Sequence, residues 1–521
     1  MKIYKSIGII MMATVFILSG CTDTSSKDEV QIVLSDSEVN IDGKVASTNK
    51  ESAVYVGADI IYYEEGKDET YGEGSKEDAH SKEEAEKHTV ITITKPGTYV
   101  VSGSISAGQI AVDLGEDAKE DAEAVVTLVL NNAEITCSVA PSIVVLNAYE
   151  CGDDEEENAT SKVDTKEAGF HLILAEDSEN VVNGAYVAKI YKDGTTKEDI
   201  EKDEAKKKYK FDAAIDSQVS FNIDARENGK LTVNAENEGI SSALHMTING
   251  GEIVINSHDD AINTSEDNVS VLTINGGIIT CDSGFGDEGD GIDSNGYIVM
   301  NGGYVIACAN GRSQDSGIDS DKGIYINGGS LLASGNMYDE VSKDSEQLFA
   351  VFHFAQTVKE NEMIMITDEE DRPITAFYAA NDYNMAVYSQ PEFMEGTYHL
   401  YKVSAVTGDL NGSIYTNITD YQDAVQLQTG GSFMMGGLGM GGGHGRMPEG
   451  ERPEMPEGER PEMPEGERPE MPEGERPGMP GMDGKRPGDG RGIREDNLQA
   501  EATTEFVFDK ESYQFSGISE K

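Results

Sequence analysis

A tetrapeptide that returns at a constant interval constrains the fold of this chain more than any other feature of the sequence. Asn-Gly-Gly, preceded by Ile or Met, occurs four times, and each copy begins 26 residues after the previous one. An apolar run leads into each copy and a β-rich run follows it, while Asn and Gly tolerate the left-handed backbone conformation that a turn requires. A fixed interval of this length is typical of repeat architectures. The four copies begin at Ile248, Ile274, Met300 and Ile326.

A third short strand follows in each repeat, after a polar loop of variable length. It is Ala261–Asn263 in one repeat, Gly291–Asp293 in the next and Gly317–Asp319 in the third. Three short strands joined by turns fit one coil of a parallel β-helix, in which equivalent residues of neighbouring coils lie about 4.8 Å apart. A left-handed hexapeptide helix would need a period of about six residues, which the sequence lacks. We therefore predict an all-β chain built on a right-handed, single-stranded parallel β-helix of three short strands and about 26 residues per coil.

The rest of the chain divides into segments by composition. Alternating apolar residues extend the predicted β-helix to residues 89–335, after a tether and charged N-terminal segment at 21–88. We expect a small β module at 336–429, and its final strand at 503–521. The stretch between them, 430–502, is rich in Gly, Met, Pro and Glu and repeats the octapeptide MPEGERPE. Such a composition cannot bury a core, so we predict a disordered insertion.

The first residues carry the pattern of an export signal. Lys2 and Lys5 precede a 12-residue apolar run, Ile7–Leu18, which is too short to span a hydrocarbon core about 30 Å thick. The run leads into Leu-Ser-Gly-Cys, which resembles the bacterial lipobox and implies that residues 1–20 are a signal peptide and that Cys21 is lipidated. An ordinary signal peptide with an incidental cysteine is the alternative. We expect a lipid-anchored protein on the extracellular face of a bacterial cell membrane.

The charge balance of the chain excludes one class of partner. It holds 40 basic and 97 acidic residues, a net charge of −57. Nucleic-acid binding depends on Lys and Arg that neutralise phosphates, so this class is excluded, whereas an acidic surface suits the capture of divalent cations. The five cysteines form no CxxC pair, so zinc ribbons and thioredoxin-like chemistry have no support.

The third strands end in oxygen donors. Asn263, Asp293 and Asp319 follow equivalent isoleucines, and carboxylates stacked at this spacing repel one another without a cation. Calcium takes six to eight oxygen ligands in flexible geometry, magnesium demands a tight octahedron, and no His or Cys joins the cluster to favour zinc. The alternative is a solvated Asp/Asn ladder without metal. The candidate calcium ligands are Asp260, Asn263, Asp290, Asp293, Asp319 and Asp321.

Several of these segments together resemble one family. Gly289–Ser294 (GDGIDS), Ser316–Asp321 (SGIDSD) and the pattern within Val126–Gly184 are similar to the clostridial carbohydrate-binding β-helix lipoproteins, over roughly residues 90–412. Those proteins bind cellulose and polygalacturonate, and their fold resembles that of the calcium-dependent pectate lyases. The resemblance implies calcium in the Asp-rich loops, held here by Asp290, Asp293 and Asp319.

The function expected from the sequence is calcium-assisted binding of a plant-type polysaccharide, polygalacturonate or cellulose, by a monomer at the cell surface. A calcium-dependent polysaccharide lyase is one alternative, and it would need a base for which Arg312 is the candidate. A structural surface adhesin without a sugar ligand is the other. The sequence assigns no catalytic residue. It contains no Trp, so Tyr297, Tyr304 and Tyr325 are the candidates for stacking against a sugar.

Overall fold

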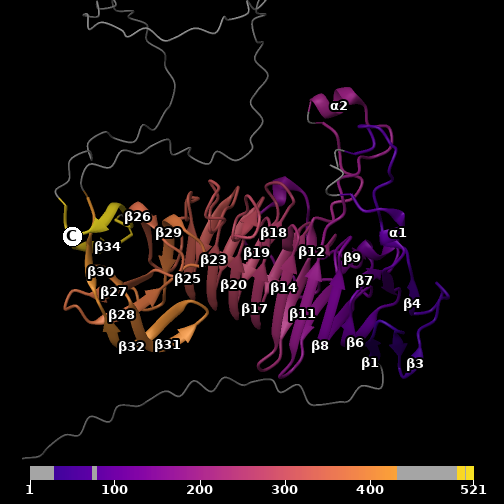
Figure 1. Cartoon of the computed structure of the whole chain (residues 1–521), viewed down its shortest axis with the longest axis horizontal. Coiled ribbons are helices and arrows are strands. Elements are labelled where there is room, and N and C mark those ends of the chain that lie inside the picture. The colour runs from indigo at the N-terminus through magenta and orange to yellow at the C-terminus, as the bar shows by residue number, and fades with distance from the viewer. Residues whose placement is uncertain (1–28, 73–78, 203, 431–501, 511) are drawn as a thin grey trace, which may run out of the picture. The chain divides into compact units, whose positions relative to one another are not determined.

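The computed structural model describes residues 29–72, 79–202, 204–430, 502–510 and 512–521 (Figure 1). The predicted signal peptide, Cys21 and nearly all of the predicted insertion at 430–502 lie outside these residues. Within them the chain is all-β, and the α-helices α1 (Lys82–Ala85) and α2 (Lys197–Glu201) are short. No helix in this part of the chain is long and apolar enough to cross a membrane. The sheets are large, mixed in strand direction and not closed.

The described chain forms two compact units. The first contains residues up to 257 together with 262–278, and the second contains 258–261 together with the residues from 279 onward. The first unit therefore holds the first two copies of the tetrapeptide, and the second unit holds the other two.

Parallel ladders dominate the first unit, where strands far apart in the sequence run side by side (Figure 1). In one ladder, Leu128, Leu172, Ile223, Ile248 and Ile274 occupy the same position on successive strands, and all five side chains are buried. The strands of this ladder are β6 (Gly97–Ile105), β8 (Val126–Cys137), β10 (Phe170–Leu174), β13 (Phe221–Ala225), β16 (His245–Ile248) and β19 (Val271–Ile274). A second ladder continues from β8 through β11 (Glu179–Gly184), β14 (Lys230–Ala235) and β17 (Glu252–Asn256).

A further sheet of the first unit carries the third strand of the repeats that lie in this unit. It runs through β4 (Val54–Gly57), β5 (Thr89–Ile93), β7 (Gly108–Asp113), β9 (Ile143–Asn147), β12 (Ala213–Ser217), β15 (Glu238–Ser242) and β18 (Ile262–Thr264). Strands also occur within 21–88, where we expected a tether and charged segment. Strand β1 (Glu29–Leu34) pairs parallel with β6 and then antiparallel with β2 (Asn40–Ile41), which pairs with β3 (Lys44–Val45).

The second unit begins with parallel pairs and then changes direction. Strand β22 (Tyr297–Met300) pairs parallel with β24 (Gly323–Ile326), and β23 (Tyr304–Cys308) pairs parallel with β25 (Ser330–Gly335). Antiparallel pairing follows, and an aromatic core forms around Phe352, Tyr388 and Phe508. The remaining strands are β20 (Ile278–Asp282), β21 (Asp293–Ser294), β26 (Phe349–Val358), β27 (Met363–Asp368), β28 (Pro373–Phe377), β29 (Tyr383–Ser389), β30 (Gly396–Val403), β31 (Ala405–Asn411), β32 (Ile414–Gln422), β33 (Val425–Gln428), β34 (Phe506–Phe508) and β35 (Gln514–Glu520).

The four tetrapeptide copies share one backbone conformation at the turn. The second glycine of every copy has a positive φ, from +86° to +106°, a conformation that few residues other than glycine adopt. Within each unit the 26-residue step fixes the register, with Ile248 opposite Ile274 and Met300 opposite Ile326. The asparagines of the turns then stack, as the interval predicts: the Asn275 amide donates to Asn249 Oδ1 at 2.8 Å, and the Asn327 amide donates to Asn301 Oδ1 at 3.0 Å.

Candidate functional site

Three aspartates of the second unit converge where two Gly-Ile-Asp segments stack on each other. Asp293 begins β21, Asp290 lies three residues before it, and Asp319 occupies the same position one repeat later. One carboxylate oxygen from each of the three residues lies within 4.8 Å of the other two. The stacking is made by the backbone, because the Asp319 N–H donates to the Ile292 carbonyl at 2.8 Å and the Ser294 N–H donates to the Asp319 carbonyl at 3.2 Å.

Glycine precedes each Ile-Asp pair because the backbone passes too close to other chain segments for a side chain. A Cβ on Gly291 would lie 2.6 Å from the Gly317 carbonyl oxygen, and a Cβ on Gly317 would overlap the Ser334 nitrogen. The Gly-Ile-Asp motif is therefore a packing requirement of the stack, and the stack in turn brings Asp293 and Asp319 together.

The backbone around Asp290 is held by neighbouring carboxylates. Its N–H donates to Asp260 Oδ1 at 2.7 Å, and the Gly289 N–H donates to Asp315 Oδ2 at 2.7 Å. The Asp290 side chain accepts a hydrogen bond from the Ser316 N–H at 2.6 Å through Oδ1. Asp290 is thus fixed on both sides.

Burial and mutual repulsion make these carboxylates hard to ionise together. Burial, with the charge of Asp319 as the next cause, raises the pKa of Asp290 well above its usual range. Burial, followed by the charges of Asp319 and Asp321, raises the pKa of Asp293 to about 7. Near neutral pH the cluster is therefore stabilised either by a bound proton or by a cation that takes the place of the proton.

The other residues expected at this site have different places. Asp260 supports the Asp290 backbone, and Asp321 is exposed and acts on Asp293 through its charge. Asn263 belongs to the first unit, in β18, where its side-chain amide donates to Glu238 Oε1 at 3.2 Å. Its Oδ1 is buried and has no hydrogen-bond partner among the described residues.

One carboxylate that is affected by the charge of Asp319 was not among the residues predicted from the sequence. Asp339 follows β25 in a half-buried loop, and burial, with the charge of Asp319 as the next cause, raises its pKa to about 6. It lies beyond Gly335, where the 26-residue period ends, so no repeat position pointed to it. The influence of Asp319 on it results from the path of the loop and not from the repeat.

Arg312, the candidate base, and Tyr297 and Tyr325, candidates for stacking against a sugar, also lie in the second unit. The Arg312 guanidinium donates through Nη2 to the carbonyls of Gly284 and Gly286, at 3.0 and 2.6 Å, so this arginine holds a loop. Tyr297 and Tyr325 are half-buried, and their ring centroids lie 6.5 Å apart at an angle of 39°.

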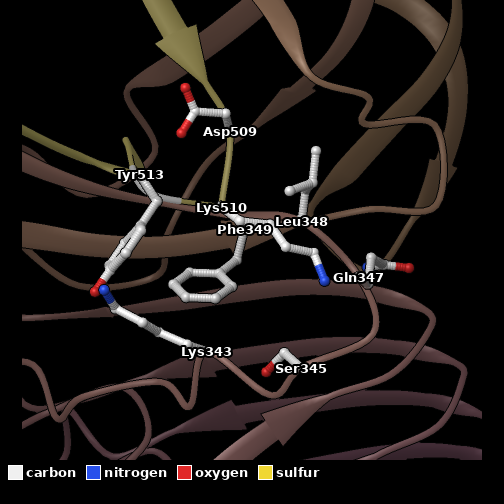
Figure 2. A pocket seen from close by; sticks show the side chains of 8 residues that line it. All are labelled: Lys343, Ser345, Gln347, Leu348, Phe349, Asp509, Lys510 and Tyr513. Carbon is white, nitrogen blue, oxygen red and sulfur yellow. The ribbon is translucent and has the colours of Figure 1, made fainter.

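A hollow elsewhere in the second unit has a different character. Lys343, Lys510, Phe349 and Tyr513 line this hollow, and in Figure 2 the Lys343 side chain reaches toward Tyr513. Phe349 packs against Tyr513 with ring centroids 4.9 Å apart, and the Lys343 ammonium lies 5.8 Å from the centre of the Tyr513 ring. None of the three clustered aspartates lines this hollow.

Comparisons with known proteins cover this region. Residues 87–168 and 159–370 match the family described as carbohydrate-binding domain-containing protein. A carbohydrate-binding domain-containing protein of Acetivibrio thermocellus is 29% identical over 172 residues, which make up 32% of this chain and 44% of the relative, so the match spans less than half of the relative's length. The solved structure of the polysaccharide lyase-like protein from C. thermocellum, a gadolinium derivative, is 22% identical with a TM-score of 0.34, and the match covers 60% of this chain and 91% of that one. Because the two family matches together span more than half of the 521 residues, the chain belongs to the family of carbohydrate-binding domain-containing proteins.

Proposed function

We propose that this protein binds polysaccharide with the help of a calcium ion held by Asp290, Asp293 and Asp319. The observation that carries the proposal is the convergence of three carboxylate oxygens within 4.8 Å in a half-buried place where burial and repulsion oppose their ionisation. Membership of the carbohydrate-binding family supports the polysaccharide part of the proposal.

The donor set suits calcium better than other common metals. The three clustered side chains are all carboxylates, and calcium accepts carboxylate ligands in six- to eightfold flexible geometry. Zinc favours His and Cys, and magnesium retains a strict octahedron with several waters. Asp260 and Asp321 of the same unit remain predicted ligands, and Asn263, in the first unit, remains a predicted calcium ligand apart from this cluster. Calcium would supply positive charge to the cluster and open positions for oxygen atoms of a ligand.

The need for a cation at this site favours an acidic polysaccharide, such as polygalacturonate, over neutral cellulose as the ligand. A chain with a net charge of −57 repels a polyuronate unless a cation lies between them. A calcium ion shared between protein and uronate carboxylates provides that link.

The strands that carry the aspartates are proposed to be part of the coils of a right-handed, single-stranded parallel β-helix.

Binding, and not lyase chemistry, is the proposed activity. A lyase would need a base free to remove a proton from the sugar. The guanidinium of the candidate base, Arg312, donates hydrogen bonds to the carbonyls of Gly284 and Gly286. Polygalacturonate that is incubated with the protein should therefore remain free of the unsaturated products that a lyase makes, which absorb in the ultraviolet.

A retention assay tests the proposal. The protein is passed over polygalacturonate and cellulose with calcium or with a chelator, and calcium affinity is measured by titration calorimetry. We expect retention on polygalacturonate with calcium and its loss with chelator. Equal retention in both buffers would remove calcium from the mechanism, and no retention on either polymer would overturn the binding proposal.

The proposed location is the outer face of a bacterial membrane, reached through a lipid on Cys21. The pattern of basic residues, a 12-residue apolar run and Leu-Ser-Gly-Cys supports it. Replacing Cys21 by Ala removes the thiol that would carry the lipid. We predict that the wild-type protein sediments with membranes and the variant does not, as measured by immunoblot of cell fractions. A variant that still sediments with membranes would contradict the anchor.

A further inference from the structure

An exposed aromatic side chain stands on the loop that leads into the aspartate cluster. Phe285 lies five residues before Asp290 and keeps 55% of its surface exposed. Its ring is nearly parallel to that of His258, at an interplanar angle of 11° and a centroid distance of 6.4 Å. At that distance the two rings are offset, so His258 supports Phe285 without covering it.

A single exposed aromatic residue is ordinary on a protein surface, but the loop that carries this one is held firmly. The guanidinium of Arg312 binds the carbonyls on both sides of Phe285, those of Gly284 and Gly286. The buried amide of Asn310 donates to the carbonyls of Gly286 and Ser283, at 2.9 and 3.2 Å. Two side chains from one turn therefore fix the backbone that presents the ring.

The loop also packs closely against the segment that holds His258. A Cβ on Gly286 would overlap the His258 carbonyl oxygen, so only glycine allows this approach. Two residues further along, Asp260 accepts the hydrogen bond from the Asp290 N–H at 2.7 Å. The two aromatic rings and two carboxylates of the site thus stand on the same pair of contacting segments, 258–260 and 285–290.

We propose that Phe285, supported by His258, is the platform on which a pyranose ring of the polysaccharide stacks beside the calcium site. This inference rests on the proposed function and names a further binding subsite for it. One face of a pyranose presents C–H groups, which are apolar and carry slight positive charge, and the face of an aromatic ring is apolar and slightly negative. Flat stacking on Phe285 would place sugars along the two segments that lead to Asp290. Arg312 and Asn310 are positioning residues for the platform.

The test compares variants for retention on polygalacturonate and on cellulose, and for calcium affinity by calorimetry. Phe285→Ala should weaken polysaccharide binding about tenfold while calcium affinity stays unchanged. Phe285→Tyr keeps a ring and should bind as the wild type does. Tyr421→Ala removes another exposed aromatic side chain of the same unit and should have no effect, which makes it the matched control.

The outcomes separate this inference from the calcium proposal. If Phe285→Ala binds polysaccharide as tightly as the wild type while chelator abolishes binding, the platform is wrong and the calcium site stands. If Phe285→Ala loses binding and chelator has no effect, the platform stands and the calcium proposal fails. An equal loss in Tyr421→Ala, or a wild type that binds neither polymer, would overturn the platform.

Discussion

Two columns of the second unit use the same 26-residue step and behave in opposite ways. In the asparagine column, Asn327 stacks on Asn301, and in the aspartate column, Asp319 stacks on Asp293. An amide carries both a donor and an acceptor, so the Asn327 amide satisfies Asn301 Oδ1 directly. An ionised carboxylate only accepts, so the aspartate column cannot satisfy itself.

The difference shows what the repeat contributes and what it leaves to the side chains. The interval brings equivalent residues together in both columns. Whether the result is a structural ladder or a place for a ligand depends on the chemistry at that position. A column of amides satisfies itself, whereas in the half-buried column of carboxylates burial and the neighbouring charges raise the pKa of Asp293 to about 7, which favours a bound proton near neutral pH.

A buried carboxylate of the first unit offers a test of whether burial makes an aspartate keep its proton. Asp216 in β12 accepts hydrogen bonds from Gln218 Nε2 at 2.8 Å and the Asp212 N–H at 3.2 Å. Burial, followed by the charge of Asp212, raises its pKa to about 8. The folded state therefore keeps a proton that the unfolded chain loses near its usual pKa of about 4. The free energy of unfolding should fall as pH rises between those two values, with a slope of up to about 1.4 kcal/mol per pH unit.

The variant Asp216→Asn cannot ionise and should lose this contribution. We predict that the free energy of unfolding of the wild type falls more steeply between about pH 5 and pH 8 than that of the variant, which keeps the pH dependence of other buried carboxylates such as Asp293. Urea denaturation in chelator at both pH values measures the difference. Asp117→Asn, which removes a charge from an exposed position, is the control and should keep the wild-type slope. Equal slopes for Asp216→Asn and the wild type would contradict the prediction.

Substitutions at Asp293 test whether the aspartate column binds a cation. A ligand that binds only the folded protein raises the free energy of unfolding by about 2.7 kcal/mol at a hundredfold excess over its Kd. We predict that calcium raises the melting temperature of the wild type and that Asp293→Ala loses most of this gain. Asp293→Asn retains an oxygen donor and should lose less. Polysaccharide retention should follow the same order. Because calcium binds ionised carboxylates, its affinity for the wild type should also rise as pH rises through about 7.

The alternative, a solvated ladder, predicts the reverse. There, loss of a carboxylate relieves repulsion, and Asp293→Ala should melt above the wild type even with calcium present. A wild-type melt that does not respond to chelator would also contradict a calcium site. Thermal melts of the three proteins in both buffers separate these cases.

Much of the stacking was predictable because it depends on a strict interval. The 26-residue step predicted the pairing of Ile248 with Ile274 and of Met300 with Ile326, and it brought Asp293 and Asp319 together. The strand at Glu29–Leu34 also has a signal, since Val30, Ile32 and Leu34 alternate with polar or exposed positions, but the polar run Thr22–Glu29 that leads into it favours a tether.

The interval does not predict the path of the irregular loops. Asp339 follows the last repeat, so its place beside Asp319 depends on a loop with no periodic counterpart. Phe285 lies in a variable loop for the same reason, and the arginine and asparagine that fix it come from a different repeat. Asn263 shares the motif position of Asp293, yet its amide is engaged by Glu238, a partner that the repeat does not specify.

The smallest expected effect belongs to the asparagine column and completes the comparison. Asn327→Ala removes a hydrogen bond between two exposed side chains, so it should cost about 1 kcal/mol or less. Asn275→Ala removes the equivalent 2.8 Å bond in the first unit and should cost a similar amount. Because an amide column needs no cation, both losses should be the same with calcium and with chelator, as measured by urea denaturation. A loss at Asn327 that appears only with calcium would show that the two columns act together, and that the amide ladder is part of the binding site.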